Sequence, residues 1–261
     1  MLYLVENLNN NLFDLNDKVA IVTGGNKGLG KFYTIALASF GAKVFVVSST
    51  QNGWDELREE FEKNNEFLEL FQIDITTPNA AITIVNEAIS RFGKIDILVN
   101  NAGMQRRNPI FEFNDKDWDE IIQLNLNAVY HLSKAVAYEM SKRKQGKIIN
   151  IGSMQSFTAG KRIFPYTASK HGIAGLTKAY AEALAEYNIQ VNTLSPGYIE
   201  TDMTRVLKND PVRGPEIEGH IPGGQWGEPK DLVGPLIFLA SNASDYVTGV
   251  NLPVDGGYLL R

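Results

Sequence analysis

Tyr166 and Lys170 lie four residues apart in the segment Tyr-Thr-Ala-Ser-Lys, and Ser153 lies thirteen residues upstream of Tyr166. Residues four apart on a helix share one face, so the lysine ammonium can lie beside the phenol and favour the phenolate. An isolated tyrosine titrates near ~10, and a cation that lowers this pKa suits general acid-base chemistry at neutral pH. Ser153 follows an apolar run, so we expect it at the carboxyl end of a strand, where it can hold a substrate oxygen beside the phenol.

The spacing of this pair is not informative by itself, because the chain contains a second Tyr-x-x-x-Lys pair, Tyr130 and Lys134. On a helix such a pair is usually a packed aromatic ring beside a solvated lysine. The residues upstream distinguish the two copies. A strand-end serine precedes Tyr166 by thirteen positions, whereas Asp117 stands at the same distance before Tyr130. We therefore assign the acid-base chemistry to Tyr166.

Short apolar runs rich in valine, isoleucine and leucine alternate with helical patterns along the chain. Near-continuous runs of this kind are typical of strands buried on both faces, as in parallel sheets. The predicted strands are 18–23, 43–48, 68–74, 95–99, 147–151, 189–194 and 250–254. The predicted helices are 29–40, 54–63, 80–92, 115–142, 166–187 and 229–240. This alternation predicts a doubly wound α/β fold, with a parallel sheet of about seven strands between two helical layers. For this sheet we expect the strand order 3-2-1-4-5-6-7.

The chain has 261 residues, enough for one large α/β domain or two small ones. No charge block or Pro/Gly-rich linker divides it, so we predict a lead-in over 1–15 and a single domain over 16–261. The segment 201–224 interrupts the rhythm with several prolines and glycines after the sixth strand. Long insertions at this edge of an open sheet are often functional. We interpret the segment as a mobile substrate lid, with a static surface excursion as the alternative.

Composition excludes several classes of function. Hydrophobic residues make up 44% and charged residues 21% of the chain, which is ordinary for a soluble globular protein. The net charge of −5 argues against a nucleic-acid partner, and no apolar run approaches the ~20 residues of a membrane span. Cysteine is absent and the three histidines have no metal-ligand spacing, so we expect no metal. A cytoplasmic setting is compatible with this composition.

A glycine-rich segment, 23–30, follows the first predicted strand and opens the first predicted helix. Gly24, Gly28 and Gly30 have the spacing Gly-x-x-x-Gly-x-Gly. Glycines permit close backbone approach, and a helix N-terminus offers free N–H groups to a pyrophosphate. The segment therefore predicts dinucleotide binding. The alternative is a glycine-rich turn that only packs the helix on the strand.

A second polar segment, Asn-Asn-Ala-Gly over 100–103, follows the fourth predicted strand. Its asparagines can bridge neighbouring strand ends, and its small residues permit a ligand to approach, so it is expected to form the second wall of the cofactor site. Asp74 ends the third predicted strand and can accept a hydrogen bond from an adenine amino group or cap a turn. Asn125 is polar within an apolar helix and can bond the local backbone or hold a water in a proton path.

These motifs, in this order, resemble the short-chain dehydrogenase/reductase family from about Leu15 to Arg261. The resemblance implies a Rossmann-type domain that transfers a hydride between NAD(P) and an alcohol or ketone. It implies a catalytic tetrad of Asn125, Ser153, Tyr166 and Lys170. The cofactor-binding residues that it implies are Gly24, Asn26, Lys27, Gly28, Leu29, Gly30, Ser48, Asp74, Ile75, Asn101, Ala102, Gly103, Tyr166, Lys170, Pro196, Gly197, Ile199 and Thr201.

Further segments around 101–107, 152–156, 221–227 and 243–247 resemble the sugar-acid dehydrogenases of this family. The substrate-binding residues expected from this likeness are Arg106, Arg107, Ser153, Gln155, Arg162 and Tyr166. A guanidinium fork suits a carboxylate, so we expect a gluconate/5-ketogluconate or deoxy-ketogluconate type of substrate. The arginines can also be a solvated basic pair. The other hypotheses are a 3-oxoacyl or simple ketone reductase and a non-catalytic NAD(P)-sensing interaction protein.

The end of the second strand bears on the choice of cofactor. NAD-preferring relatives usually carry an acid there, whereas this chain has Ser48, which does not repel a 2′-phosphate. Lys27 lies in the glycine loop, where NADP-preferring relatives often carry a base, although the usual arginine after the acid position is missing. NADP(H) is therefore favoured over NAD(H). The resemblance also implies a homo-oligomer, a homotetramer or a homodimer, in which the helices containing Asn125 and Tyr166 pack across subunits.

Overall fold

The computed structural model describes residues 12–64 and 67–261, and within them the chain forms one sheet of seven parallel strands. The strands are β1 (Val19–Thr23), β2 (Lys43–Ser48), β3 (Leu68–Gln72), β4 (Ile97–Asn100), β5 (Gly146–Ile151), β6 (Ile189–Pro196) and β7 (Asn251–Val254). Their order is β3-β2-β1-β4-β5-β6-β7, and each neighbouring pair is parallel. The predicted fold class and strand order are confirmed.

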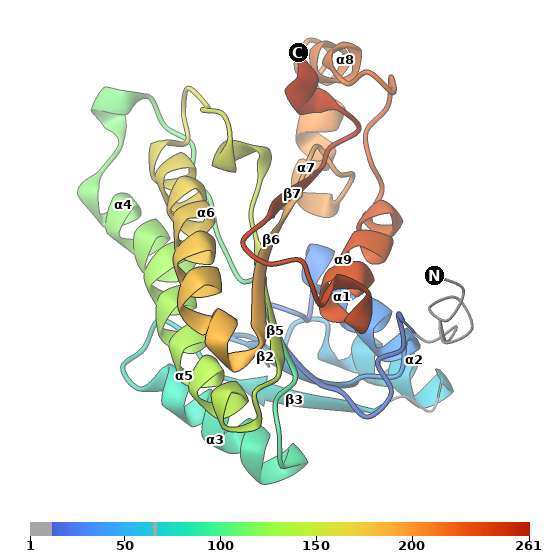
Figure 1. Cartoon of the computed structure of the whole chain (residues 1–261). Coiled ribbons are helices and arrows are strands. Elements are labelled where there is room, and N and C mark those ends of the chain that lie inside the picture. The colour runs from blue at the N-terminus through green and yellow to red at the C-terminus, as the bar shows by residue number, and fades with distance from the viewer. Residues whose placement is uncertain (1–11, 65–66) are drawn as a thin grey trace, which may run out of the picture.

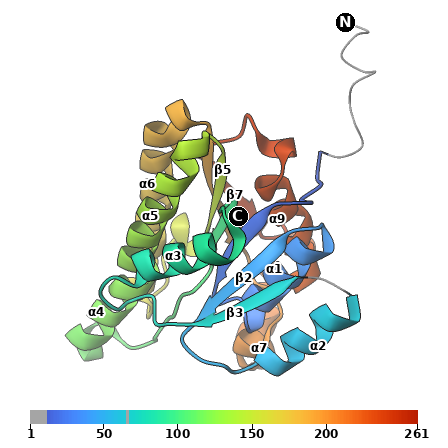
Figure 2. The ribbon, with the colours of Figure 1, turned by 90° about the horizontal axis from the view of Figure 1, so that it is seen from below.

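Helices cover both faces of this sheet (Figures 1 and 2). The α-helices are α1 (Gly28–Ser39), α2 (Trp54–Asn64), α3 (Ala80–Phe92), α4 (Asp115–Ile122), α5 (Ala128–Arg143), α6 (Phe164–Leu184), α7 (Asp202–Lys208), α8 (Arg213–His220) and α9 (Val233–Ala240). Helices α3, α4, α5 and α6 lie on one side, and α1, α2 and α9 lie on the other. The three-layer arrangement follows, with α7 and α8 beyond the edge of the sheet.

Alternation along the buried strands builds two separate cores. In β1, Ala20 and Val22 belong to the cluster beneath α1 and α9, whereas Ile21 belongs to the cluster beneath α3 and α5. All five residues of β1 are buried, as expected for a central strand with helices on both faces. The same alternation occurs in β2, where Val46 joins the first cluster and Phe45 the second.

Several predicted boundaries need correction. The helix predicted over 115–142 is interrupted by a π-helical turn, Gln123–Asn127, between α4 and α5. The strand predicted over 68–74 ends at Gln72, so Asp74 lies in the following loop. The helix predicted over 229–240 begins as a 3-10 turn, Pro229–Leu232. Helix α6 begins at Phe164, with Pro165 in its first turn, where a proline costs no helical hydrogen bond.

The folded domain begins earlier than residue 16. Leu15 is fully buried in the core, and its N–H donates to the Phe40 carbonyl at 2.9 Å. The Leu12 carbonyl accepts a hydrogen bond from the Ala243 N–H at 3.1 Å. Residues 12–15 therefore pack on the domain, and the boundary predicted after residue 15 is too late. The remainder of the predicted lead-in, 1–11, lies outside the described residues.

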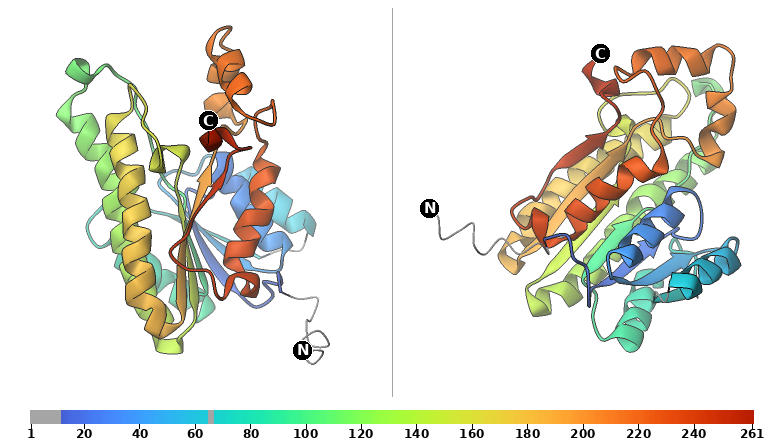
Figure 3. Two further views of the ribbon diagram at one scale, coloured as in Figure 1. Left: turned by 45° about the horizontal axis from the view of Figure 1, so that its top comes forward. Right: turned by 90° about the vertical axis from the view of Figure 1, so that its right-hand side faces the viewer.

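The segment predicted as a lid contains α7 and α8 and lies above the carboxyl edge of the sheet, next to the C-terminal residues (Figure 3). A small cluster of its own, Ile217, Ile221 and Trp226, is buried there. The His220 ring packs at a tilt against the Tyr258 ring, with ring centroids 4.4 Å apart. The segment is thus tied to the C-terminus by aromatic contacts. Among the described helices, none has the length and apolar content needed to cross a membrane.

We predict that Leu15→Ala lowers the free energy of unfolding by ~2–5 kcal/mol, because a fully buried leucine leaves a cavity when truncated. Urea denaturation measures this change. Leu12→Ala is the matched control, since Leu12 is 42% exposed and its truncation should change stability little. Equal effects of the two substitutions would show that residues 12–15 do not pack as the structure places them.

Candidate active site

The loops that follow β1, β4, β5 and β6 all lie at one edge, because parallel strands end on the same side of a sheet. The chain reverses its direction of winding between β1 and β4, which are adjacent although two strands, β2 and β3, separate them in sequence. Open α/β sheets bind ligands at the carboxyl ends of the strands beside such a switch point. The glycine loop follows β1 and the Asn-Asn-Ala-Gly segment follows β4, so both flank this point.

The glycine loop has the backbone geometry that its sequence predicts. Gly24 and Gly28 have φ values of +62° and +53°, in the left-handed region that favours glycine. A Cβ on Gly30 would lie 2.1 Å from the Gly24 carbonyl oxygen, so no larger residue fits without a shift of the loop. The N-cap of α1, Lys27, makes no side-chain capping hydrogen bond. The first N–H groups of α1 are therefore available to an anion, which fits a dinucleotide pyrophosphate.

Thr23 and Asn101 clamp the two loops together. The Thr23 hydroxyl accepts hydrogen bonds from the backbone N–H groups of Asn101 and Ala102, both at 3.0 Å. The Asn101 side chain donates to the carbonyls of Thr23 and Gly24 at 2.9 and 3.2 Å. The expectation that these asparagines bridge strand ends is correct for both, since Asn101 joins the ends of β1 and β4 and the Asn100 amide donates to Asn150 at the end of β5 at 2.8 Å.

Tyr166, Ser153 and Lys170 are brought together, as predicted. Tyr166 lies in the first turn of α6, and a hydrogen bond from Ser153 lowers its pKa, as does the charge of Arg107. Burial outweighs both effects, and the pKa of Tyr166 is raised above its ordinary value. The Lys170 ammonium donates to the Ile151 carbonyl at 2.6 Å and lies 5.5 Å from the centroid of the Tyr166 ring. Burial lowers the pKa of Lys170 to about 8.

One part of the sequence argument is therefore wrong in detail. We expected Lys170 to lower the pKa of Tyr166, but the lowering comes from Ser153 and Arg107, and burial opposes it. The ammonium of Lys170 is directed at the end of β5 instead. Its closest described hydrogen-bond acceptor is a backbone carbonyl, so Lys170 ties the helix that carries Tyr166 to the strand that precedes Ser153.

Asn125 lies in the π turn and is 1% exposed. Its side chain accepts a hydrogen bond from the Met104 N–H and donates to the Met104 carbonyl, both at 2.9 Å. It also donates to the Ser169 hydroxyl at 3.2 Å, and Ser169 donates to the Tyr166 carbonyl at 2.8 Å. Of the two alternatives for Asn125, these contacts favour backbone bonding, since one amide joins the loop after β4 to the turn of α6 that carries Tyr166.

The two adjacent arginines have different surroundings. Arg106 is paired with Asp117 and with Glu120, the latter at 2.6 Å, and these contacts raise its pKa. Arg107 is exposed and forms no ion pair with any carboxylate in the described part of the chain. The side-chain amide of Gln105 is oriented with its oxygen toward Arg107. This oxygen accepts hydrogen bonds from Nε and Nη2 of Arg107 at 3.1 and 3.2 Å. Arg106 is therefore engaged within the protein, whereas the charge of Arg107 reaches Tyr166.

Gln155 and Arg162 flank the same site. The Gln155 N–H donates to the Ser153 hydroxyl at 3.2 Å, and its side-chain oxygen accepts from Thr167 at 3.4 Å. Arg162 is exposed, and its carbonyl accepts a hydrogen bond from the Asn108 N–H at 3.1 Å. Its backbone thus joins the segment before α6 to the loop after β4.

Three of the expected cofactor residues use their side chains within the protein. Asn26 is 2% exposed and donates to the Asn52 carbonyl at 2.7 Å. The Ser48 hydroxyl donates to the Thr50 carbonyl at 2.6 Å and accepts from Trp54 Nε1 at 3.2 Å. Asp74 accepts from the N–H and hydroxyl of Thr76 at 2.9 and 2.7 Å. These residues shape the loops around the site.

The remaining expected residues lie beyond strand ends. Pro196 ends β6, and the Gly197 N–H donates to the Val254 carbonyl at 2.9 Å. Ile199 is buried in the first core, Ile75 packs against the second, and Thr201 caps α7 through Thr204. Leu29 packs against the first core beside the glycine loop, and Gly103 is exposed beside Asn125.

Tyr198 was not anticipated. It follows Pro196-Gly197, and burial raises its pKa to about 12 while the charges of Arg213 and Arg107 oppose this. Its ring lies 5.0 Å from that of Trp226 and 5.1 Å from that of Tyr258. The only signal in the sequence is its position directly after the sixth strand. Tyr198 therefore links the buried cluster of Ile217, Ile221 and Trp226 to the surroundings of Arg107.

The chain is similar to known proteins along almost its whole length. A family model described as short chain dehydrogenase matches residues 18–211. The chain is 45% identical over 249 residues to YgcW of Escherichia coli K12, an uncharacterized oxidoreductase, with 95% of each chain covered. It is 43% identical over 256 residues to 2-dehydro-3-deoxy-D-gluconate 5-dehydrogenase of Dickeya dadantii strain 3937, covering 96% of this chain and 99% of that one.

A solved structure agrees with these relatives. The crystal structure of a gluconate 5-dehydrogenase from Burkholderia cenocepacia J2315, in complex with NADP and tartrate, has a TM-score of 0.92 and is 37% identical. The match covers 96% of this chain and 98% of that one. The chain therefore belongs to the short-chain dehydrogenase/reductase family. It is an NAD(P)-dependent oxidoreductase related to the gluconate 5-dehydrogenases.

The lowered pKa of Lys170 predicts a pH dependence of stability. An unfolded lysine titrates near ~10.4, so between pH 8 and that value the unfolded chain binds more protons and the free energy of unfolding rises with pH. Lys170→Met removes this titration. We expect the free energy of unfolding of the unsubstituted protein, relative to Lys170→Met, to rise by ~2 kcal/mol between pH 7 and pH 10. Urea denaturation at both pH values measures it.

The matched control is Lys134→Met, which removes an exposed lysine from the second Tyr-x-x-x-Lys pair. Its stability relative to the unsubstituted protein should change little over the same pH range. If the Lys170→Met variant and the unsubstituted protein have parallel pH profiles, burial does not shift the lysine as the structure indicates.

Proposed function

We propose that the protein interconverts a secondary alcohol and a ketone of a sugar acid, of the gluconate/5-ketogluconate or deoxy-ketogluconate type, with NADP(H) favoured over NAD(H). The observation that carries this proposal is the charge of Arg107 acting on the phenol of Tyr166, which is hydrogen-bonded to Ser153. A carboxylate held by the guanidinium would place the rest of a small polyol acid beside the acid-base residue. Relatives named for gluconate derivatives support the same substrate class.

The chain's own residues supply position and proton transfer, and a nicotinamide would donate or accept the hydride. Tyr166 exchanges a proton with the substrate oxygen, which the Ser153 hydroxyl holds in place. The raised pKa of Tyr166 keeps the phenol protonated at neutral pH, which suits ketone reduction. Lys170 holds α6 against the end of β5 and keeps a positive charge near the ring. Asn125 braces the start of α6 through Ser169.

Among the described residues, Arg107 suits the substrate carboxylate better than Arg106. Two carboxylates already bind Arg106, so a substrate would have to displace them. Among the described residues, the hydrogen-bond partner of Arg107 is the amide of Gln105, and the charge of Arg107 acts on both Tyr166 and Tyr198. Tartrate, a dicarboxylic hydroxy acid, is bound in the B. cenocepacia relative. A ketone reductase with neutral substrates would not need Arg107, and a non-catalytic sensor would not need the complete tetrad.

Two observations support NADP(H). Ser48, at the end of β2, brings no negative charge to a 2′-phosphate, and Lys27 is exposed at the N-terminus of α1. The structure of the B. cenocepacia relative contains NADP. The hydroxyl of Ser48 is already bonded to Thr50, so we expect Lys27 to contribute more of the preference than Ser48.

We also propose a cytoplasmic homo-oligomer, a homotetramer or a homodimer. The helical layer that contains Tyr166 exposes large apolar side chains, with Trp118, Tyr130 and Tyr138 exposed by 43%, 40% and 67%. Exposed aromatic residues in one layer favour contact with a second copy. The absence of cysteine is compatible with a cytoplasmic setting.

Tyr166→Phe should reduce kcat by ~10²–10⁴-fold, because it removes the proton-transfer group while keeping the ring. Steady-state assays with 5-ketogluconate and NADPH measure this loss. Fluorescence titration should show NADPH binding within about threefold of the unsubstituted protein, and the same titration with NADH ranks the cofactors. Tyr130→Phe, in the other Tyr-x-x-x-Lys pair, is the control and should stay active. Retention of most activity by Tyr166→Phe contradicts the mechanism.

Arg107→Ala should lower kcat/KM for 5-ketogluconate by ~10²-fold, since a charged hydrogen-bonded contact is worth about 1.5–3 kcal/mol. A neutral ketone should lose far less. Arg162→Ala should have a smaller effect than Arg107→Ala, and Arg91→Ala, in the last turn of helix α3, should have none. Equal losses for acid and neutral substrates would favour the ketone reductase instead.

A further inference from the structure

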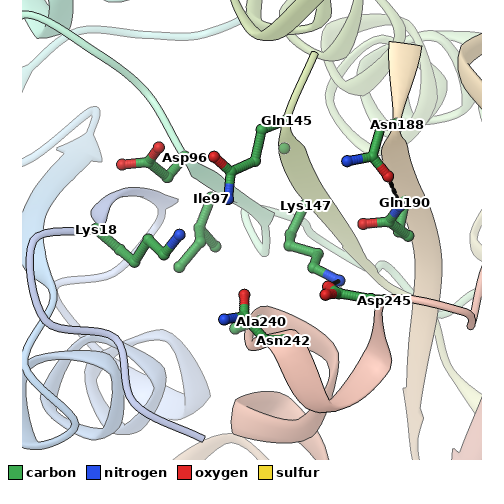
Figure 4. Close-up of a pocket in the computed structure, with 11 residues that line it drawn as sticks. Lys18, Asp96, Ile97, Gln145, Lys147, Asn188, Gln190, Ala240, Asn242 and Asp245 are labelled. Atoms are coloured by element: carbon green, nitrogen blue, oxygen red, sulfur yellow. Dashed lines mark hydrogen bonds and ion pairs between the residues drawn. The ribbon is translucent and has the colours of Figure 1, made fainter. Parts of the chain in front are cut away.

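A second polar site lies at the amino edge of the sheet, opposite the catalytic residues (Figure 4). A mostly enclosed cavity of about 50 Å³ is lined there by residues from the starts of four strands and from the turn after α9. The lining residues are Lys18, Asp96, Ile97, Gln145, Gly146, Lys147, Asn188, Gln190, Ala240, Asn242 and Asp245. One water needs on the order of 10–15 Å³ of such space. The cavity therefore has room for several waters or for one small polyatomic ion.

Positive charge is in excess around this cavity. Lys147 is 7% exposed, and its ammonium lies 2.8 Å from Asp245, which is mostly exposed at the cavity mouth. Asp96 is 5% exposed, and both of its oxygens are engaged, one by Arg143 at 2.6 Å and the other by Lys94 at 3.0 Å. Asp96 carries one negative charge and its two partners carry two positive charges, so one positive charge is left over.

Lys18 adds another positive charge without a partner of its own. Within the described part of the chain it forms no ion pair, although its side chain is only partly exposed. The pKa of Lys147 is lowered mainly by burial, and the charge of Lys18 lowers it further. The two ammonium groups therefore repel each other across the cavity. Four cations, Lys18, Lys94, Arg143 and Lys147, face two carboxylates, Asp96 and Asp245.

Neutral donors complete the lining. The side chains of Lys18, Gln145 and Asn242 point toward the same space in Figure 4. Gln190 donates to the Asn188 side chain at 3.2 Å, so that amide pair is already satisfied. No hydrogen bond to a described residue engages the amides of Gln145 and Asn242. Amide N–H groups beside two ammonium groups form a set of donors suited to the oxygens of a small anion.

We propose that this cavity binds a small oxyanion of the size of phosphate or sulfate between Lys18 and Lys147. The anion offsets the repulsion between the two ammonium groups and accepts hydrogen bonds from Gln145 and Asn242. It joins the start of β1 to β5 and to the turn before β7, so binding stabilises the amino edge of the sheet. The site is independent of the cofactor and the substrate, since every group in it lies at the edge opposite Tyr166.

Thermal unfolding in inorganic phosphate, with sodium chloride added to constant ionic strength, tests the proposal. We expect the Tm to rise by about 5 °C at phosphate concentrations far above Kd. Lys18→Gln should lose most of this rise. Lys63→Gln removes the same charge from an exposed position on α2 and should keep it, which controls for phosphate at the glycine loop and for general salt effects.

A second variant supplies the negative charge covalently. Gln145→Glu should raise the Tm in the absence of phosphate and abolish the phosphate response, because its carboxylate takes the place of the anion. Crystals soaked in selenate should show an anomalous peak between Lys18 and Lys147. Two results would overturn the proposal: an equal phosphate-induced rise in Tm for Lys18→Gln and Lys63→Gln, or no selenate peak in the cavity. The cavity would then hold only water beside the Lys147–Asp245 salt bridge.

Discussion

The distance between the loops after β1 and β4 is the constraint on which the site depends. Thr23 and Asn101 set it with four hydrogen bonds of 2.9 to 3.2 Å. These bonds connect the loop that offers helix N–H groups to the loop that carries Arg107. The glycine loop and the loop of Arg107 are therefore positioned by the same contact. The groups that face a ligand lie on loops, but the bonds that hold these loops are made at the ends of strands, which are rigid.

The neighbouring residue, Asn100, extends this constraint to helix α6. Its amide donates to Ser133 at 2.9 Å and to Asn150 at 2.8 Å, and Asn150 donates to Thr177 on α6 at 2.9 Å. Thr177 in turn pairs with a threonine hydroxyl of β6 at 2.7 Å. All of these groups are buried, so leaving one unpaired would cost about 1–3 kcal/mol. The chain of bonds fixes α6 on the sheet and thereby places Tyr166 and Lys170.

The sheet and the glycine loop are predictable from the sequence because they rest on local patterns. Buried strands are continuous apolar runs, and the glycine spacing reflects steric limits at Gly24 and Gly30. The π turn around Asn125 is not predictable in this way, because one extra residue in a helix leaves no periodic signal. The different environments of Arg106 and Arg107 depend on carboxylates from α4, a tertiary contact that the order of residues does not reveal.

The competition between burial and charge decides how Tyr166 and Lys170 can work. Lys170 is buried and Tyr166 is partly buried, and this burial disfavours the charged form of both, raising the pKa of Tyr166 and lowering that of Lys170. At neutral pH the lysine still carries its proton, since its pKa remains about 8. The phenol also keeps its proton, which is the state that the proposed ketone reduction requires. Alcohol oxidation needs the phenolate, and it therefore depends on the opposing effects of Ser153 and Arg107. A carboxylate bound at Arg107 would cancel part of that charge and so raise the pKa of the phenol further.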